Sequence, residues 1–167
     1  MKLFVKPRPA ATVALVKDSL NNNGIEVLLM KRHARDRFLP GYHVFPGGAV
    51  DKQDIPRDAI PDECLNGIKL SSSEDKMNYF THVICAIRET FEEAGILLAG
   101  SATGYFSISD PASHIRFNSY RKMVFTGELD MMEMIQKENL APAYRNIHYL
   151  TRWITPPYSP IRYDTRF

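Results

Sequence analysis

Runs of apolar residues separated by polar turns dominate the first fifty positions of the chain. Residues 12–17 and 25–31 are rich in Val, Leu and Ile, and Asn21-Asn22-Asn23-Gly24 lies between them. A polar turn between two apolar runs predicts a β-hairpin. Residues 42–45 predict a further short strand, which ends at Pro46-Gly47-Gly48.

Later in the chain the apolar period changes to that of a helix. Apolar side chains recur at helical spacing at Val83, Ile84, Ile87 and Phe91. Gly95 stands where such a helix would end, so we expect a helix over 83–94 whose Ile87 and Phe91 face the core. A second helical pattern covers about 115–140.

The remaining segments predict irregular structure and late strands. Residues 49–80 are polar and contain Ser72 and Ser73, either of which could cap a helix. Strands are expected at 148–154 and 163–167. Strands mixed with a few helices predict an α/β fold in which layers pack around a mixed sheet.

Length, charge and cysteine content narrow the class of protein. A chain of 167 residues with 44% hydrophobic content can bury one core, so 1–167 is expected to be a single domain. A net charge of +2 does not predict nucleic-acid binding, and no apolar run approaches membrane-spanning length. Cys64 and Cys85 have no metal-binding spacing and are expected to be reduced thiols of a cytoplasmic protein.

Three carboxylates are concentrated on one face of the predicted helix. Glu89, Glu92 and Glu93 are related by three and four positions and therefore project together. Like charges on one face repel, so a compensating cation is expected, and a hard divalent metal ion fits oxygen ligands best. The alternative is an ordinary solvated acidic face.

The residues around these carboxylates resemble a known signature. Gly48 and a second group match the pattern G-x5-E-x7-R-E-U-x-E-E-x-G-U, where U is aliphatic; this group is Arg88, Glu89, Glu92, Glu93, Gly95 and Ile96. The chain therefore resembles the Nudix family of diphosphate hydrolases. Thr90 stands where an aliphatic residue is usual.

One departure from the signature is larger. The glycine and the arginine are 14 positions apart in the family and 40 apart here (88 − 48), which implies an insertion within 49–80. Counted back from Arg88, the first signature glutamate falls on Phe80, and Glu74 is a candidate replacement. A branch of the family that resembles peroxisomal coenzyme A diphosphatases carries a similar insertion.

A second pattern supports the same branch. Coenzyme A-hydrolysing members carry L-L-T-x-R-S-x3-R-x3-G-x3-F-P-G-G, and residues 28–48 keep every spacing, with Met30 and His33 as the substitutions. Arg32 and Arg37 fall on its two arginines. Guanidinium groups suit phosphate oxygens, so these arginines are candidate phosphate contacts; a solvated basic loop is the alternative.

The resemblance implies a fold, a cofactor and a reaction. It implies a Nudix-type α/β/α sandwich around a mixed β-sheet, Mg²⁺ or Mn²⁺ held by Glu89, Glu92 and Glu93, and hydrolysis of coenzyme A or acyl-coenzyme A to 3′,5′-ADP and a 4′-phosphopantetheine. Glu89 is either a metal ligand or the base that activates water.

The same resemblance gives supporting roles to three further residues. Arg88 would orient a glutamate through a salt bridge, and Gly47 and Gly48 would form the turn beside the helix.

Several questions stay open at this stage. Another substrate, such as NADH or ADP-ribose, and a non-catalytic Nudix-like binding module are the alternatives. A homodimer is one open oligomeric state. Residues 153–156 and 162–167 also look like the long-insertion branch, in which more protein follows, so we expect a fragment or a shortened relative.

Overall fold

The computed structural model describes residues 5–20, 24–35, 40–101, 104–105, 108 and 110–167. Its strands are β1 (Arg8–Thr12), β2 (Val16–Asp18), β3 (Ile25–Val27), β4 (Met30–Lys31), β5 (His43–Val44), β6 (Gly47–Ala49), β7 (Ala99–Ser101), β8 (Gly104–Tyr105), β9 (Ala141–Pro142), β10 (Arg152–Ile154) and β11 (Tyr163–Arg166). Its helices are α1 (Ser73–Ala94), α2 (Pro111–Phe125) and α3 (Met131–Lys137), with 3-10 turns η1 (Lys52–Asp54), η2 (Asp62–Leu65) and η3 (Tyr144–Asn146).

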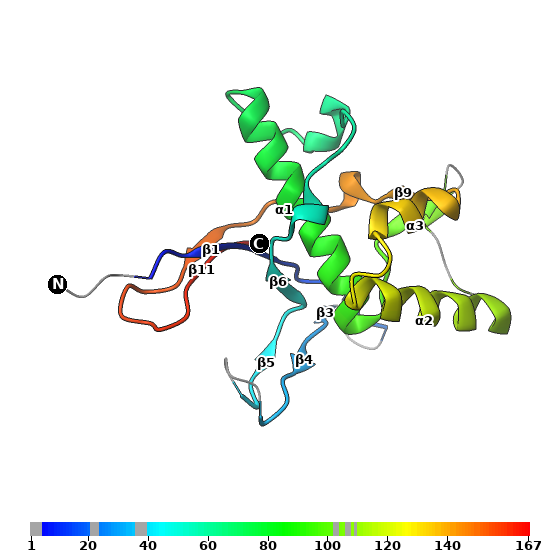
Figure 1. Ribbon diagram of the computed structural model, residues 1–167, viewed down its shortest axis with the longest axis horizontal. Helices are drawn as coiled ribbons and strands as arrows, with labels where there is room; N and C mark the ends of the chain where they lie inside the picture. The colour runs from blue at the N-terminus through cyan, green and yellow to red at the C-terminus, as the bar shows by residue number, and fades with distance from the viewer. Residues whose placement is uncertain (1–4, 21–23, 36–39, 102–103, 106–107, 109) are drawn as a thin grey trace.

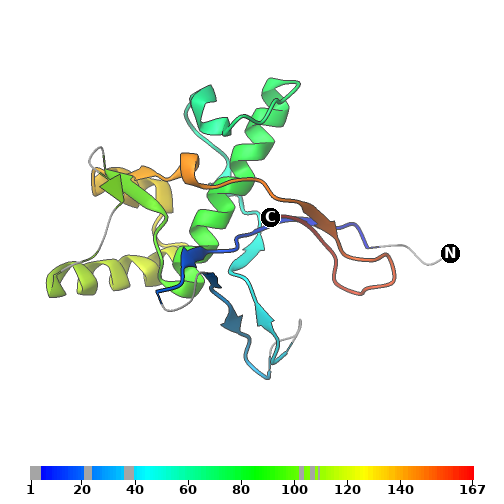
Figure 2. The ribbon, with the colours of Figure 1, turned by 180° about the vertical axis from the view of Figure 1, so that it is seen from behind.

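A mixed four-stranded sheet lies against α1, with strand order β10-β11-β1-β6. Strands β1 and β11 are parallel, and the other two pairs are antiparallel. Figure 1 shows α1 in the middle of the molecule, with β1 and β11 on one side and α2 and α3 on the other. Figure 2 shows the same arrangement from behind. The predicted α/β class with a mixed sheet is therefore confirmed.

The N-terminal hairpin forms in shorter pieces than the apolar runs predict. The run over 12–17 is divided between β1 and β2, and the run over 25–31 between β3 and β4. Strands β2 and β3 pair antiparallel, as expected, and β4 pairs with β5. The central residues of the predicted turn, 21–23, lie outside the described residues. In Figure 1 the β4–β5 pair extends away from the body of the molecule.

The helix α1 begins ten residues earlier than the apolar pattern indicates. Ser72 caps its N-terminus, since the Ser72 side chain accepts a hydrogen bond from the Asp75 N–H. Gly95 ends it in the left-handed conformation (φ 70°), and the Gly95 N–H donates to the Phe91 carbonyl. Both caps agree with the sequence. Part of the segment expected to be irregular, 73–80, is thus helical.

The main core lies between α1 and the two later helices. Its fully buried side chains come from three helices: Phe80, Ile84, Ile87 and Phe91 of α1, Phe117 and Val124 of α2, and Met131, Met134 and Ile135 of α3. The predicted core positions Ile87 and Phe91 are confirmed. Each such side chain contributes about 1.5–3 kcal/mol when fully buried.

On its other side α1 packs against the sheet through small residues. Ala11 of β1 lies against Cys85 and Ala86 of α1 in a second buried cluster. Small side chains allow the strand and the helix to approach closely. This approach places β6, the neighbour of β1, alongside the C-terminal half of α1.

The later segments agree with the sequence in type but differ in extent. The helical pattern near 115–140 forms two helices, α2 and α3, separated by a turn at Gly127, which has a positive φ of 74°. The strand expected at 148–154 is confined to β10, and that expected at 163–167 forms β11. In the part of the chain that the structure describes, no helix combines the length and apolar character needed to cross a bilayer.

Candidate active site

The three glutamates lie at the C-terminal end of α1, against the glycines of β6. A Cβ on Gly48 would lie 2.3–2.5 Å from the carboxylate atoms of Glu89, so only glycine leaves room for this side chain. A Cβ on Gly47 would lie 2.4 Å from the Ala11 carbonyl oxygen. Glycine at both positions therefore lets β6 pass between β1 and the acidic face of α1.

Arg88 joins this acidic face to the body of the protein. Its Nη1 contacts Glu89 Oε1 at 2.9 Å and Glu92 Oε1 at 3.1 Å, and its Nη2 donates to the Ala49 carbonyl at 3.1 Å. Its Nε and Nη2 also donate to the two carboxylate oxygens of Asp54, at 2.8 and 3.0 Å. Burial lowers the pKa of Arg88, but these carboxylates outweigh burial and leave the pKa raised, so the guanidinium stays charged.

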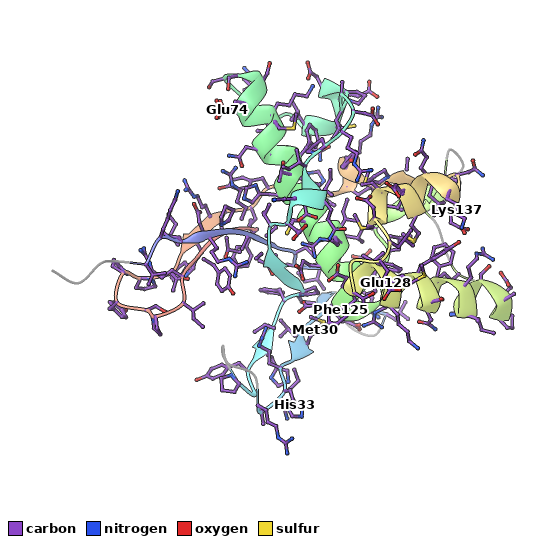
Figure 3. The ribbon with its side chains drawn as sticks, in the orientation of Figure 1. Met30, His33, Glu74, Phe125, Glu128 and Lys137 are labelled. Atoms are coloured by element: carbon purple, nitrogen blue, oxygen red, sulfur yellow. The ribbon has the colours of Figure 1, made fainter. Side chains whose placement is uncertain are left out.

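Asp54 is the residue that the sequence reasoning missed. It is fully buried, and its carboxylate also accepts the Asp51 N–H at 2.7 Å in the capping box of η1. Phe80, where the backward count placed the first signature glutamate, is a core side chain that is 1% exposed. Glu74 is exposed at the far end of α1 from Phe125 and Glu128 (Figure 3), so it does not replace that glutamate.

A forward count would have found Asp54. It lies six positions after Gly48, where G-x5-E places its glutamate, and Asp there is shorter by one methylene. We infer that the first half of the signature is intact with this substitution and that the extra residues come after Asp54.

Burial sets the protonation of Glu89. Burial raises the pKa of Glu89 to about 7, and the neighbouring charges of Glu92 and Glu93 add to this, while Arg88 opposes it. The side chain is only 13% exposed. Burial thus disfavours the ionised form of Glu89, and perturbed carboxylates of this kind are common at functional sites.

Glu93 is held by Gly47, which lies in strand β6 and not in the turn that the sequence predicts. Its Oε2 accepts the Gly47 N–H at 3.0 Å. The residue as a whole is exposed, yet the packing around its carboxyl group raises its pKa, and the Gly47 N–H and the charge of Arg32 oppose the rise.

The donor set has the chemistry of a site for a hard divalent cation, although the carboxylates do not converge. Glu89 and Glu92 share one nitrogen of Arg88, whereas Glu93 turns to Gly47. Among the described residues, no three carboxylate, histidine or cysteine side chains are grouped closely enough to hold a metal ion. Carboxylate oxygens are the ligands that suit Mg²⁺ or Mn²⁺, so the donor types fit such an ion.

A polar cavity of about 540 Å³ opens beside these carboxylates. Its lining comes from β1, β6, η1, α1 and the α2–α3 turn and includes Arg8, Gln53, Arg88, Glu89, Glu92 and Phe125. A larger, mostly apolar cavity of about 690 Å³ is lined by residues of β1 and of the middle of α1, and none of the sequence-predicted site residues lines it. The polar cavity is therefore the one that belongs to the acidic site.

The structure thus brings together most of the sequence-predicted site residues. Gly47 and Gly48 of β6 adjoin the carboxylates of α1, and Arg32 follows β4. Arg37 lies outside the described residues. The roles of these residues in binding stay predictions.

Comparisons with known proteins identify similar chains. A sequence profile of the NUDT19 Nudix domain matches residues 69–167. The chain is 28% identical over 181 residues to "Acyl-coenzyme A diphosphatase NUDT19" of Xenopus laevis, an alignment that covers 88% of this chain and 47% of the relative. It is 26% identical over 178 residues to the protein of the same name from Homo sapiens, covering 86% and 47%. The chain therefore spans about half the length of the curated relatives that it matches.

A solved structure shares the fold. The chain superimposes on a NUDIX hydrolase from Alicyclobacillus acidocaldarius with a TM-score of 0.73 and 28% sequence identity, over 97% of this chain and 68% of that one. This likeness confirms the expected α/β/α sandwich.

Proposed function

The chain belongs to the NUDT19 Nudix domain family, and on that premise we propose that it hydrolyses the diphosphate of coenzyme A or acyl-coenzyme A. The products are 3′,5′-ADP and a 4′-phosphopantetheine, which keeps its acyl group in the second case. The observation that carries the proposal is the buried cluster of Arg88 with Asp54, Glu89 and Glu92 beside the glycines of β6. The printed names of the relatives support the substrate class.

The proposed site works with Mg²⁺ or Mn²⁺ held by Glu89, Glu92 and Glu93. When bound, the ion neutralises charge on the diphosphate and lowers the pKa of water. Rotation of Glu93 away from the Gly47 N–H would bring its carboxylate toward the other two. The same rotation would free this N–H to donate to a phosphate oxygen.

Arg88 and Glu89 divide the remaining work. Asp54 accepts a hydrogen bond from Arg88 Nε and so fixes the guanidinium, whose Nη1 keeps Glu89 and Glu92 in position. Glu89 is either the third metal ligand or the base; as the base it takes a proton from the attacking water while the new P–O bond forms and the bridging P–O bond breaks, and Glu92 and Glu93 then hold the cation. Arg32 of the preceding loop, and Arg37 by its place in the motif, contact phosphate oxygens.

A comparison of substrates tests this proposal. Coenzyme A, dephospho-coenzyme A, ADP-ribose and NADH are offered at equal concentration with Mg²⁺ or Mn²⁺, and the products are separated by chromatography. Faster turnover of coenzyme A than of dephospho-coenzyme A is expected, since the 3′-phosphate adds a contact for an arginine. Equal or faster hydrolysis of ADP-ribose or NADH rejects the substrate class.

A non-catalytic binding module is the second candidate. The observation in its favour is that Arg88 and Gly47 already hold the three carboxylates in the described structure. Binding of coenzyme A in calorimetry, with no hydrolysis of any of the four compounds at saturating Mn²⁺, would support it.

A further inference from the structure

Arg121 of α2 reaches across to the end of α1 and binds the main chain of two candidate metal ligands. Its Nε donates to the Glu92 carbonyl at 2.8 Å, and its Nη2 donates to the Glu93 carbonyl at 2.7 Å. One guanidinium thus contacts two consecutive peptide groups.

These carbonyls are at the place where a helix most needs external donors. The last four carbonyls of a helix have no partner within the helix. In α1 the Phe91 carbonyl receives the Gly95 N–H, and the next two receive Arg121. Arg121 therefore completes the hydrogen bonding of the turn that carries Glu92 and Glu93.

The positive charge of Arg121 also suits the C-terminal end of α1. The C-terminus of a helix carries a partial negative charge and favours nearby cations. The last turn of α1 contains no basic residue and instead carries Glu92 and Glu93. Arg121 supplies from another helix the positive charge that the last turn of α1 lacks.

Gly95 leaves space for Arg121 to reach the carbonyls of Glu92 and Glu93. It adopts the left-handed conformation, and a Cβ at this position would lie 3.2 Å from Arg121 Nη1. The glycine that ends the helix thus also leaves room for the guanidinium that caps it.

We propose that Arg121 is a positioning residue of the active site, which holds the backbone of Glu92 and Glu93 so that their carboxylates can bind a divalent cation. This inference rests on the proposed function. Arg88 and Gly47 hold the side chains of these glutamates, whereas Arg121 holds their main chain. Outer partners of this kind alter metal affinity or activity by about 10–100-fold when removed.

The test compares the wild-type chain of 167 residues with R121A, R121K and a control, R116A. Arg116 lies on the same helix and makes a similar two-pronged contact, but to Glu138, away from α1. The Mn²⁺ affinity of each metal-free protein is measured by calorimetry without substrate, below its melting temperature. The kcat and KM for coenzyme A are measured in parallel.

We expect R121A to bind Mn²⁺ about tenfold or more weakly and to lose kcat, with KM for coenzyme A within about twofold of wild type. R121K keeps the positive charge but loses the planar guanidinium that donates to both carbonyls. Its affinity for Mn²⁺ should therefore lie between those of wild type and R121A. R116A should match wild type in both measurements. A purely stabilising cap would lower the melting temperature of R121A without changing Mn²⁺ affinity.

Wild-type Mn²⁺ affinity in folded R121A overturns the inference. If R121A does not fold, R121K decides, and wild-type affinity in R121K then overturns it. A wild-type chain that binds Mn²⁺ without hydrolysing coenzyme A rejects the proposed substrate alone. A wild-type chain that binds no Mn²⁺ rejects the proposed metal site, and the positioning role with it.

Discussion

Arg88 and Asp54 lie 34 positions apart in the chain and form a buried ion pair through two hydrogen bonds, Nε to Oδ1 at 2.8 Å and Nη2 to Oδ2 at 3.0 Å. The pair links η1 to α1. It also fixes the arginine that contacts Glu89 and Glu92. The stability of the fold and the geometry of the acidic site therefore depend on one carboxylate.

Replacing Asp54 by Ala should destabilise the fold strongly. The change leaves the Arg88 charge buried without its main partner, which typically costs about 3–5 kcal/mol of the free energy of unfolding. Urea denaturation measures this loss. The control is D62A, because Asp62 pairs with Lys76 at the surface, where an ion pair contributes about 0–1 kcal/mol. Equal losses in the two variants would contradict the structural role of Asp54.

Replacing Glu93 by Gln should lower kcat by on the order of 10² or more, because it removes a charge that holds the cation opposite the transition state. Gln keeps the size of the side chain and can still accept the Gly47 N–H. Steady-state hydrolysis of coenzyme A is the measurement. E74Q, at the exposed start of α1, should retain wild-type activity. Full activity in E93Q would refute its assignment as a metal ligand.

The stabilisation by added metal should increase with pH. The pKa of Glu89 is about 7 in the folded protein against 4.5 for the ordinary group, so the folded state binds the extra proton between these values. Without metal, the free energy of unfolding therefore falls as pH rises through this window. A cation requires the ionised carboxylate, so its stabilising effect is small at pH 5.5 and larger at pH 8.

Melting temperatures with and without Mn²⁺ at the two pH values measure this effect. Glu92, Glu93 and Arg88 also face Glu89, so E89Q is needed to assign the pH dependence. If the Mn²⁺-induced change in melting temperature depends on pH equally in E89Q and wild type, the pH dependence comes from a group other than Glu89.

Replacing Gly48 by Ala should displace the Glu89 carboxylate, because a Cβ there would lie within 2.5 Å of it. We expect a loss of kcat of about tenfold with a smaller effect on folding, since the end of a long side chain can move. A double-mutant cycle with E89A, which removes the atoms that the Cβ would meet, isolates the contact. If G48A lowers activity as much in the E89A background as in wild type, the effect does not pass through Glu89.

Local signals in the sequence predicted the elements more accurately than their limits. Gly95 marked the C-terminal end of α1, whereas the apolar pattern placed its start at position 83 and left Ser72 as one of two serines that could cap a helix. Such caps can be read from the sequence because they satisfy main-chain groups that the helix itself leaves unpaired. The apolar run over 12–17 predicted one strand, but the structure divides it between β1 and β2. Where a strand begins and ends depends on which neighbouring strands pair with it, and the sequence of one strand does not specify its partners.

By itself, the sequence determined the α/β class and the helix with its acidic face, since both follow from residues close together in the chain. The glycines, 40 positions before Arg88, were placed beside that face by the resemblance to the Nudix signature. Only the tertiary structure identified Asp54 as the partner of Arg88 and Arg121 as the cap of Glu92 and Glu93. These contacts join residues 28 to 34 positions apart, on elements that meet only when the core forms. No periodicity or local spacing encodes such a meeting, because it depends on how the helices and strands pack.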